Sequence, residues 1–156
     1  MIGCNPPPRP ILDYRVSLEF CARLENLPRA FSRIWPAFEH AGLRSRVRRR
    51  VELVFEELFA NTVLHGYKVP AGAAPDPNKP SQLVWIELRA KPGEVQMIYQ
   101  DAADPFNPLL VEAPALGGAQ ERQLGGLGLI MVTKVPHQSR YERIDGRNLL
   151  HLTFRE

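Results

Sequence analysis

The sequence predicts a two-layer α/β sandwich, with helices on one face of a mixed, mainly antiparallel sheet. Stretches of alternating apolar residues, typical of half-buried strands, occur near the N-terminus, in the middle and at the C-terminus. The strands of the middle and of the C-terminus come in pairs joined by short turns, which predicts antiparallel pairing. Segments with helical apolar periodicity lie between them and are expected to pack as the second layer.

The composition limits the chain to ordinary classes of protein. At 156 residues, with 44% hydrophobic and 24% charged residues, it fits one globular domain. We expect the proline-rich residues 1–12 to form a flexible tail and residues 13–156 to form a single domain. No stretch approaches the roughly 18 apolar residues of a membrane-spanning helix, and no signal peptide or cysteine framework is evident. The sequence therefore predicts a cytoplasmic protein that does not enter the membrane.

The domain is expected to begin with a strand and a helix. Residues 14–20 alternate apolar and polar side chains, as a half-buried strand does. Residues 26–42 predict a helix with Asn26 as its cap and Gly42 as its end. Pro36 should kink this helix or split it.

A second helix is expected over residues 45–65, with Ser45 as its N-cap and Gly66 as its left-handed end. Its first turn is rich in arginine, which opposes the helix dipole at a cost of roughly 0.3 to 1 kcal/mol for each exposed cation. These arginines form a solvated helix face, or they meet carboxylates of this chain or of an acidic partner. Nucleic acid is not favoured, because no RNA-stacking or major-groove motif accompanies them. The cluster comprises Arg44, Arg46, Arg48, Arg49 and Arg50.

The rest of the chain predicts two hairpins and one more helix. Residues 82–90 and 94–100 form the first hairpin, after a loop rich in proline and glycine. The glycine-rich residues 101–126 exceed what a simple connection needs, which points to function. Residues 127–135 predict a buried helix, and the closing hairpin turns at an Asp-Gly pair.

The polar residues of the second helix separate into two groups around its axis. At 100° per residue, Glu52 and Glu56 point away from the apolar arc, whereas Glu57 and Asn61 lie one above the other at its edge. Partial loss of water favours a protonated carboxylate, which suits Glu57 to general-base work. The Asn61 oxygen suits a Mg²⁺ ion held chiefly by phosphates. The alternative is an ordinary hydrogen-bonded pair at a helix margin. The apolar arc comprises Val51, Val54, Phe55, Leu58 and Thr62.

Two later segments carry further candidates. Asp101 at a strand end can accept a hydrogen bond from an exocyclic amine such as that of adenine, although aspartate is also common in turns. Gly125, Gly126 and Gly128 open the next helix, where backbone N–H groups and the helix dipole favour phosphate. A flexible hinge is the alternative, because the spacing fits neither a Rossmann nor a P-loop motif.

Taken in order, the segments FEELFANTVLHGY, DAADPFNP and GGLGLIMVTKV, followed by YERIDGRNLLHLTF, resemble the GHKL ATPases. Within that superfamily they most resemble the bacterial anti-sigma-factor serine kinases. The likeness extends over residues 14–154, and its most specific element is ExxxN followed by HGY. It implies a Bergerat fold that holds ATP and Mg²⁺ between the helix layer and a loop called the ATP lid.

By position, the resemblance assigns a role to the residues of the first two segments. Glu57 matches the general base of the family, and Asn61 matches its magnesium ligand. Asp101 matches the aspartate that recognises adenine. The chain departs from the family pattern at Ala103, where glycine is usual in this nucleotide-binding segment. A methyl group there could crowd the adenine or restrict the loop, because alanine avoids backbone conformations that glycine reaches.

The resemblance also assigns roles further along the chain. Gly126 and Gly128 match the second glycine box around the phosphates. The lid corresponds to residues 111–124, whose Arg122 could meet the γ-phosphate. Thr153 in the last strand matches a hydroxyl on the adenine side, or it is a plain strand threonine.

The function implied by the resemblance is that of a protein serine kinase. It would use Mg-ATP to phosphorylate a STAS-type anti-sigma-factor antagonist and would hold a sigma factor away from RNA polymerase. A homodimer is usual in such proteins. The alternative is a nucleotide-gated module that binds a partner without phosphotransfer, which Ala103 and a short lid with few cations would favour. The catalytic domain of a histidine kinase is less favoured, because no dimerisation helix with a phosphorylatable histidine precedes the domain.

Overall fold

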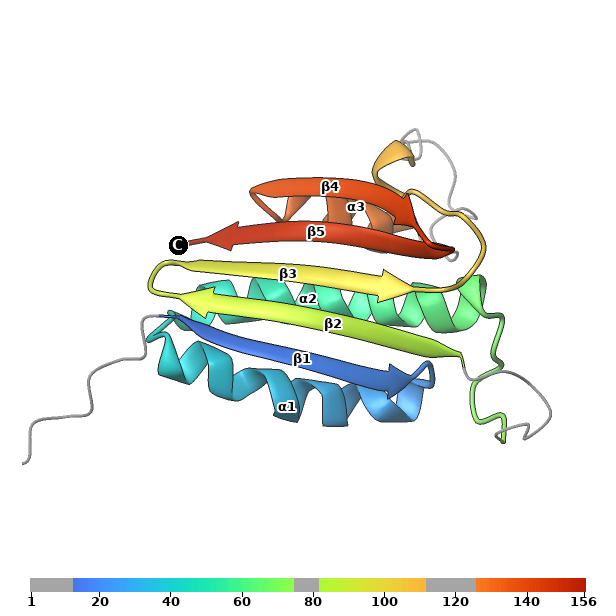
Figure 1. Cartoon of the computed structure of the whole chain (residues 1–156), viewed down its shortest axis with the longest axis horizontal. Coiled ribbons are helices and arrows are strands. Elements are labelled where there is room, and N and C mark those ends of the chain that lie inside the picture. The colour runs from blue at the N-terminus through green and yellow to red at the C-terminus, as the bar shows by residue number, and fades with distance from the viewer. Residues whose placement is uncertain (1–12, 75–81, 112–125) are drawn as a thin grey trace, which may run out of the picture.

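The computed structural model describes residues 13–74, 82–111 and 126–156. In these residues five strands form one sheet in the order β1-β2-β3-β5-β4, and three α-helices pack against it (Figure 1). The predicted tail and most of the predicted lid lie outside the described residues. The strands are β1 (Tyr14–Cys21), β2 (Leu83–Lys91), β3 (Glu94–Asp101), β4 (Gln138–Ile144) and β5 (Arg147–Arg155).

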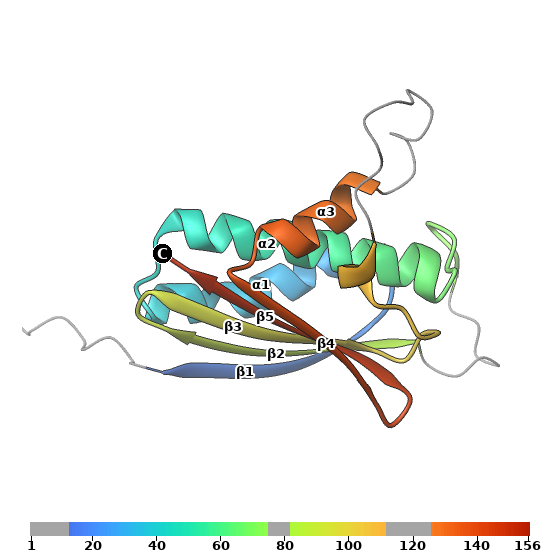
Figure 2. The same ribbon diagram turned by 90° about the horizontal axis from the view of Figure 1, so that it is seen from above.

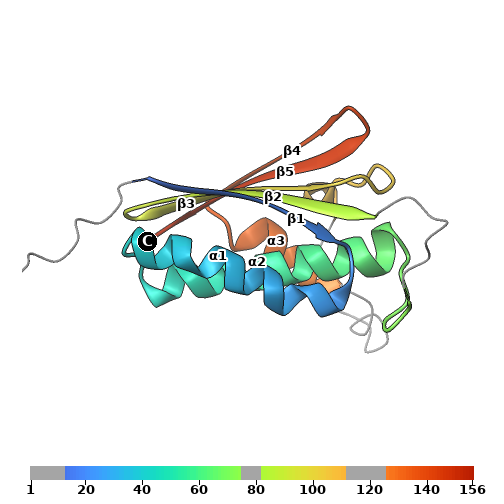
Figure 3. The same cartoon turned by 60° about the horizontal axis from the view of Figure 1, so that its bottom comes forward.

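The helices α1 (Leu27–His40), α2 (Ser45–Asn61) and α3 (Gly126–Lys134) lie on one face of the sheet, as Figures 2 and 3 show. The predicted two-layer α/β sandwich is therefore confirmed. All four strand pairings are antiparallel, which narrows the predicted mixed sheet to an antiparallel one within the described residues. No helix in that part of the chain is both long and apolar enough to cross a bilayer.

The predicted hairpins are confirmed, and their turns explain why the strands pair in register. Gly93 (φ +77°) lies in the β2–β3 turn, and Asp145 and Gly146 both have positive φ in the β4–β5 turn. Two successive left-handed residues are typical of the two-residue turn that matches the strand twist. The resulting pairing of β3 with β5 places Asp101 directly opposite Asn148.

The core lies between the sheet and the helix layer. The apolar arc predicted on α2 is fully turned toward it, and alternate residues of β2, β3 and β5 meet it from the sheet. Phe55, Phe59 and Phe154 are among the largest side chains that are completely buried. Burial of this apolar surface sets the rotation of α2 about its axis, and so it decides which side of the helix faces the sheet.

Of the two outcomes expected for Pro36, a split of the helix is not found, because Pro36 lies inside a continuous α1. The predicted ends of α2 need two corrections. Arg44, not Ser45, occupies the N-cap position of α2, and it makes no capping hydrogen bond through its side chain. At the other end, α2 continues into a π-helical turn, η2 (Thr62–Gly66), and the left-handed residue that ends it is Lys68 (φ 55°) rather than Gly66. π-helical turns often occur at functional sites.

Candidate functional site

A cleft of about 510 Å³ lies where the C-terminal end of α2 meets the chain that follows β3. Its size is within the usual range for small-molecule sites, which are mostly apolar with few polar groups. Apolar side chains from several elements form much of the lining: Leu58, Tyr99, Phe106, Leu129 and Leu150. Asp101, Asn61 and Asn148 supply polar groups among them. Such a lining suits a flat, partly polar ring system.

Asp101 ends β3 and places a nearly buried carboxylate in this cleft. Its Oδ1 accepts hydrogen bonds from Asn148 Nδ2 at 2.8 Å and from the backbone N–H of Ala103 at 3.0 Å. Its Oδ2 accepts a longer bond, 3.3 Å, from the Thr62 hydroxyl. Three donors therefore fix the carboxylate plane, and Oδ2 keeps capacity for a further donor, since a carboxylate oxygen has two lone pairs.

Asn148 connects this carboxylate to the surrounding loops. Its Nδ2 also donates to the Asp104 carbonyl at 3.0 Å, and its Oδ1 accepts from Tyr141 Oη and from an Arg143 guanidinium nitrogen, both at 2.7 Å. This residue was not predicted from the sequence. The alternation of side chains along β5 could have identified it. The even-numbered residues 150, 152 and 154 are apolar and face the core, and Asn148 is the one polar residue of β5 on that face.

A second chain of hydrogen bonds reaches Asp101 from the helix layer. Tyr99 Oη donates to Thr62 Oγ1 at 2.9 Å, and the Thr62 hydroxyl donates in turn to Asp101. Burial raises the pKa of Tyr99 well above its usual value, so its hydroxyl remains a proton donor. Thr62 therefore does more than pack in the apolar arc, because it ties the carboxylate to the end of α2.

Tyr67 also holds the segment that follows Asp101. Its hydroxyl donates to the Leu83 carbonyl at 2.7 Å and accepts from the Ala102 N–H at 2.8 Å. Burial is the main cause of its raised pKa, and the nearby Asp101 carboxylate adds to the rise. The hydroxyl therefore stays neutral and fixes the backbone next to the cleft.

Ala103 is buried and lines the cleft, and it does not adopt a positive φ. Alanine therefore fits this backbone without strain, and the expected restriction of the loop is not found. The space for its methyl group comes from Gly66: a Cβ added to Gly66 would lie 3.0 Å from the Ala103 Cβ. The space between these two positions therefore holds one methyl group without a shift of the neighbouring atoms.

Glu57 lies at the border between α2 and α3. It is half-buried, and Gly128 on α3 is so close that an added Cβ would overlap its carboxylate. The carboxylate thus lies beside the first turn of α3, the end of a helix that favours negative charge. A side chain at position 128 would displace this carboxylate.

Asn61, the last residue of α2, lines the same cleft. Its Nδ2 is buried and has no hydrogen-bond partner in the described part of the chain. Rotation of the amide exchanges its nitrogen and oxygen, so the position can offer an acceptor to a cation. Within the described ranges no three His, Cys, Asp or Glu side chains form a metal cage. The residues fit a Mg²⁺ ion that takes one protein oxygen and obtains its other ligands from phosphate and water.

Comparison with known proteins decides the family. The model of the histidine kinase-like ATPase domain matches residues 20–154. The chain belongs to this family. A search of curated proteins found no match.

Membership of the histidine kinase-like ATPase family confirms the resemblance at the level of the superfamily and supports ATP binding by this chain. The matched range contains the cleft-lining residues Asn61, Asp101 and Ala103. It also contains Glu57, which does not line the cleft but directly precedes the lining residue Leu58. Gly128 joins them through its contact with Glu57, and Gly126 begins the same helix.

One candidate from the sequence does not join this region of the ATPase domain. Thr153 lies in β5 on the sheet face opposite the helices, beside Gln96 of β3. It cannot face the cleft, because odd-numbered residues of β5 point away from the core. Asn148 on the same strand occupies the place beside Asp101 instead. Arg122 lies outside the described residues. His65 is exposed at the cleft, in the last turn before Tyr67.

Proposed function

We propose that the cleft binds ATP with the adenine against Asp101 and the phosphates directed toward the first turn of α3. The observation that carries this proposal is the Asp101 carboxylate, which is fixed by three donors at an apolar wall and retains acceptor capacity. The exocyclic amine of adenine would donate a hydrogen bond to the remaining acceptor position of this carboxylate. Glu57 and Gly128 lie at the other end of this arrangement, where α3 begins.

We further propose that the chain is a protein serine kinase. The serine oxygen of the protein substrate attacks the γ-phosphorus, the bond to the β–γ bridging oxygen breaks, and ADP leaves. Glu57 accepts the hydroxyl proton, and its position beside α3 places it near the proposed phosphate end. Mg²⁺, when bound at Asn61, would offset the negative charge of the phosphate oxygens.

The identity of the protein substrate follows only from the resemblance of the motifs. The motifs ExxxN and HGY, with the two later boxes in order, favour a STAS-type anti-sigma-factor antagonist as the phosphate acceptor. A sigma factor is the second proposed partner, and a homodimer is the proposed assembly. Cytoplasmic location accords with these partners.

Nucleotide binding is tested by replacing Asp101. Asp101→Asn keeps the shape of the side chain but replaces one acceptor oxygen by a donor, which repels the amine of adenine. We expect ATP affinity measured by calorimetry to fall about 10- to 100-fold, as for loss of a hydrogen bond to a charged group. Asp104→Asn is the matched control, because Asp104 is exposed at the same cleft. Equal ATP affinity in wild type and Asp101→Asn would contradict the adenine assignment.

Kinase activity is tested with γ-labelled ATP, Mg²⁺ and a STAS-domain antagonist from the same genome. We expect transfer to serine that is lost in Glu57→Ala, with ATP affinity retained. Glu56→Ala is the control, because Glu56 is exposed on the far side of the same helix. Persistent transfer in Glu57→Ala would exclude this residue as the base.

The second candidate function is a nucleotide-gated binding module without phosphotransfer. The observation that favours it is Ala103, whose methyl group lines the cleft next to the adenine-binding aspartate. Tight ATP binding with no transfer to any STAS-domain antagonist would select this module over the kinase.

A further inference from the structure

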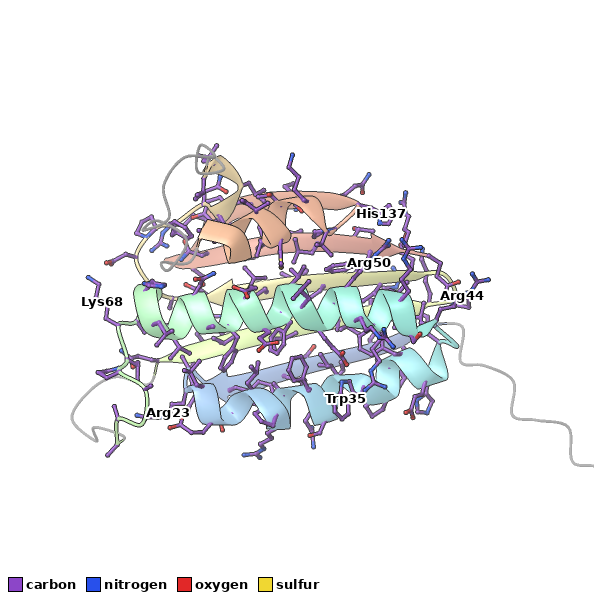
Figure 4. All side chains as sticks on the ribbon, turned by 180° about the vertical axis from the view of Figure 1, so that it is seen from behind. Arg23, Trp35, Arg44, Arg50, Lys68 and His137 are labelled. Carbon is purple, nitrogen blue, oxygen red and sulfur yellow. The ribbon has the colours of Figure 1, made fainter. Side chains whose placement is uncertain are left out.

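A second groove lies at the opposite end of α3 from the cleft. It has a volume of about 650 Å³ and is formed by the start of α2, the end of α3 and the connection to β4. Figure 4 shows Arg50 and His137 at this end of the molecule, which also holds Arg44. Four cationic side chains and no carboxylate line the groove: Arg46, Arg49, Arg50 and Lys134.

The carboxylates that pair with arginines of this cluster lie outside the groove. Arg48 pairs with Glu52 at 2.7 Å, and Arg44 pairs with Glu156 at 3.7 Å. Arg46 and Arg49 are exposed and have no carboxylate within 4.0 Å in the described part of the chain. The two arginines outside the groove are thus neutralised within the chain, whereas the groove keeps its charge.

The position of Arg46 is unfavourable for α2 itself, whereas Arg49 lies just beyond the first turn. The first turn of α2 contains no acidic residue, and its N-cap makes no side-chain hydrogen bond. Cations at this end oppose the helix dipole. Lys134, in contrast, lies in the last turn of α3, where a cation is favourable. Helix stability therefore explains Lys134 but not Arg46 and Arg49.

The spacing on α2 matches one face of a helix. Arg46, Arg49, Arg50 and Leu53 follow the pattern i, i+3, i+4, i+7, which forms a continuous stripe. Leu53 is 37% exposed, which is high for a leucine in a helix that otherwise buries its apolar residues. Val135 and Pro136 add apolar surface beside it. The stripe is thus three cations followed by an apolar contact point.

His137 adds a hydrogen-bond donor. Its Nδ1 accepts from the Arg155 N–H at 3.1 Å, so the ring hydrogen resides on Nε2 when the ring is neutral. A carboxylate is the natural acceptor for this group and for the neighbouring guanidinium groups.

We propose that this groove docks an acidic amphipathic helix of a partner protein. Carboxylates of that helix would meet Arg46, Arg49, Arg50 and Lys134, and an apolar side chain would rest on Leu53. The apolar part of the groove favours a protein over nucleic acid, because a phosphate backbone offers no apolar group to bury there. The chain's own residues 1–12 do not fit, because they contain an arginine and no aspartate or glutamate. The inference does not depend on the proposed kinase activity.

The probe is a fluorescein-labelled helical peptide that carries three glutamates and a leucine at i, i+3, i+4 and i+7. Anisotropy with the full chain should show saturable binding that weakens as salt is raised. In the double variant Arg46→Glu/Arg49→Glu we expect affinity to fall at least about tenfold. Its thermal midpoint should be unchanged or higher, because acidic residues at the start of α2 suit the helix dipole.

The matched control is Arg29→Glu/Arg33→Glu, which makes the same change of charge at two exposed positions on α1. It should retain peptide affinity. Equal losses in both double variants, no binding by the wild type, or stronger binding of duplex DNA than of the peptide would each overturn the proposal. If the glutamate variant does not fold, Arg46→Gln/Arg49→Gln replaces it, with the same outcomes expected.

Discussion

At the level of single residues, the contact between Gly128 and Glu57 links the start of α3 to the proposed base. In Gly128→Ala the added methyl group would overlap the Glu57 carboxylate, so the glutamate must move. Because the overlapping atoms are the far end of a flexible, half-buried side chain, we expect the thermal midpoint to change little and phosphotransfer to fall. Calorimetry measures the midpoint, and γ-labelled ATP measures the transfer.

The control for this prediction is the double variant Glu57→Ala/Gly128→Ala. Its thermal midpoint should match that of Glu57→Ala, and phosphotransfer should stay absent. A large fall in the midpoint of Gly128→Ala that persists in the double variant would show that the new methyl group meets the backbone and not the carboxylate.

Ala103 and Gly66 form a second coupled pair. Gly66→Ala would bring two methyl groups to 3.0 Å, which is closer than ordinary contact. Because Ala103 N–H donates to Asp101, we expect the displaced loop to weaken ATP binding. The double variant Gly66→Ala/Ala103→Gly moves the single methyl group to the other position and should restore affinity. Calorimetric titration of all four combinations gives the coupling.

The individual site residues could be predicted where one element is enough to place them. Helical periodicity separated Glu57 and Asn61 from Glu56, and a strand end placed Asp101. Of the two roles left open for Thr153, the structure supports a plain strand threonine, and the choice required counting along β5 from the turn. The same count would have identified Asn148 as a polar residue on the core face.

At the level of the elements, Pro36 is the exception to the rules of helix formation. It lies in the middle of α1, which continues from Leu27 to His40. Proline lacks the N–H that would bond to the Ser32 carbonyl and crowds that carbonyl. Pro36→Ala should therefore stabilise the domain by about 1–3 kcal/mol, measured by urea unfolding.

Pro28→Ala is the matched control for this change. Pro28 lies in the first turn of the same helix, where no intrahelical N–H bond is lost, so its replacement should change stability little. A gain at Pro28 as large as at Pro36 would show that the effect arises in the unfolded chain and not in the helix.

Element ends were less predictable than element centres. Gly66 was expected to end its helix in the left-handed conformation, as glycine commonly does. In the structure it belongs to the π-helical turn, and its lack of a side chain serves the contact with Ala103. That contact joins residues 37 positions apart along the chain, so local sequence rules cannot reveal it.

At the level of the whole molecule, the order of the strands in the sheet assembles the site. Asp101 and Asn148 are far apart in sequence and become neighbours only because β3 pairs with β5 rather than with β4. Turn chemistry predicts each hairpin separately, but it does not say which strands of two hairpins meet. The class of fold was therefore predictable, whereas the hydrogen bonds around Asp101 were not.

The two recessed regions share α3 but no lining residue. This helix begins beside Glu57 and ends at Lys134 in the basic groove, and its nine residues span about 13.5 Å at 1.5 Å each. An acidic peptide in the groove and a nucleotide in the cleft should therefore bind together. Peptide anisotropy measured with a saturating non-hydrolysable ATP analogue should give saturable binding, with any change in affinity small, about threefold at most.

Thermodynamic linkage makes this prediction testable from both sides. If the nucleotide changes the affinity for the peptide by some factor, the peptide must change the affinity for the nucleotide by the same factor. The variant Arg46→Glu/Arg49→Glu should bind the peptide more weakly and the nucleotide as before, whereas Asp101→Asn should bind the nucleotide more weakly and the peptide as before. Complete displacement of the peptide by the nucleotide would instead mean that the arginines of α2 contact the phosphates, and the groove would then be an extension of the nucleotide site.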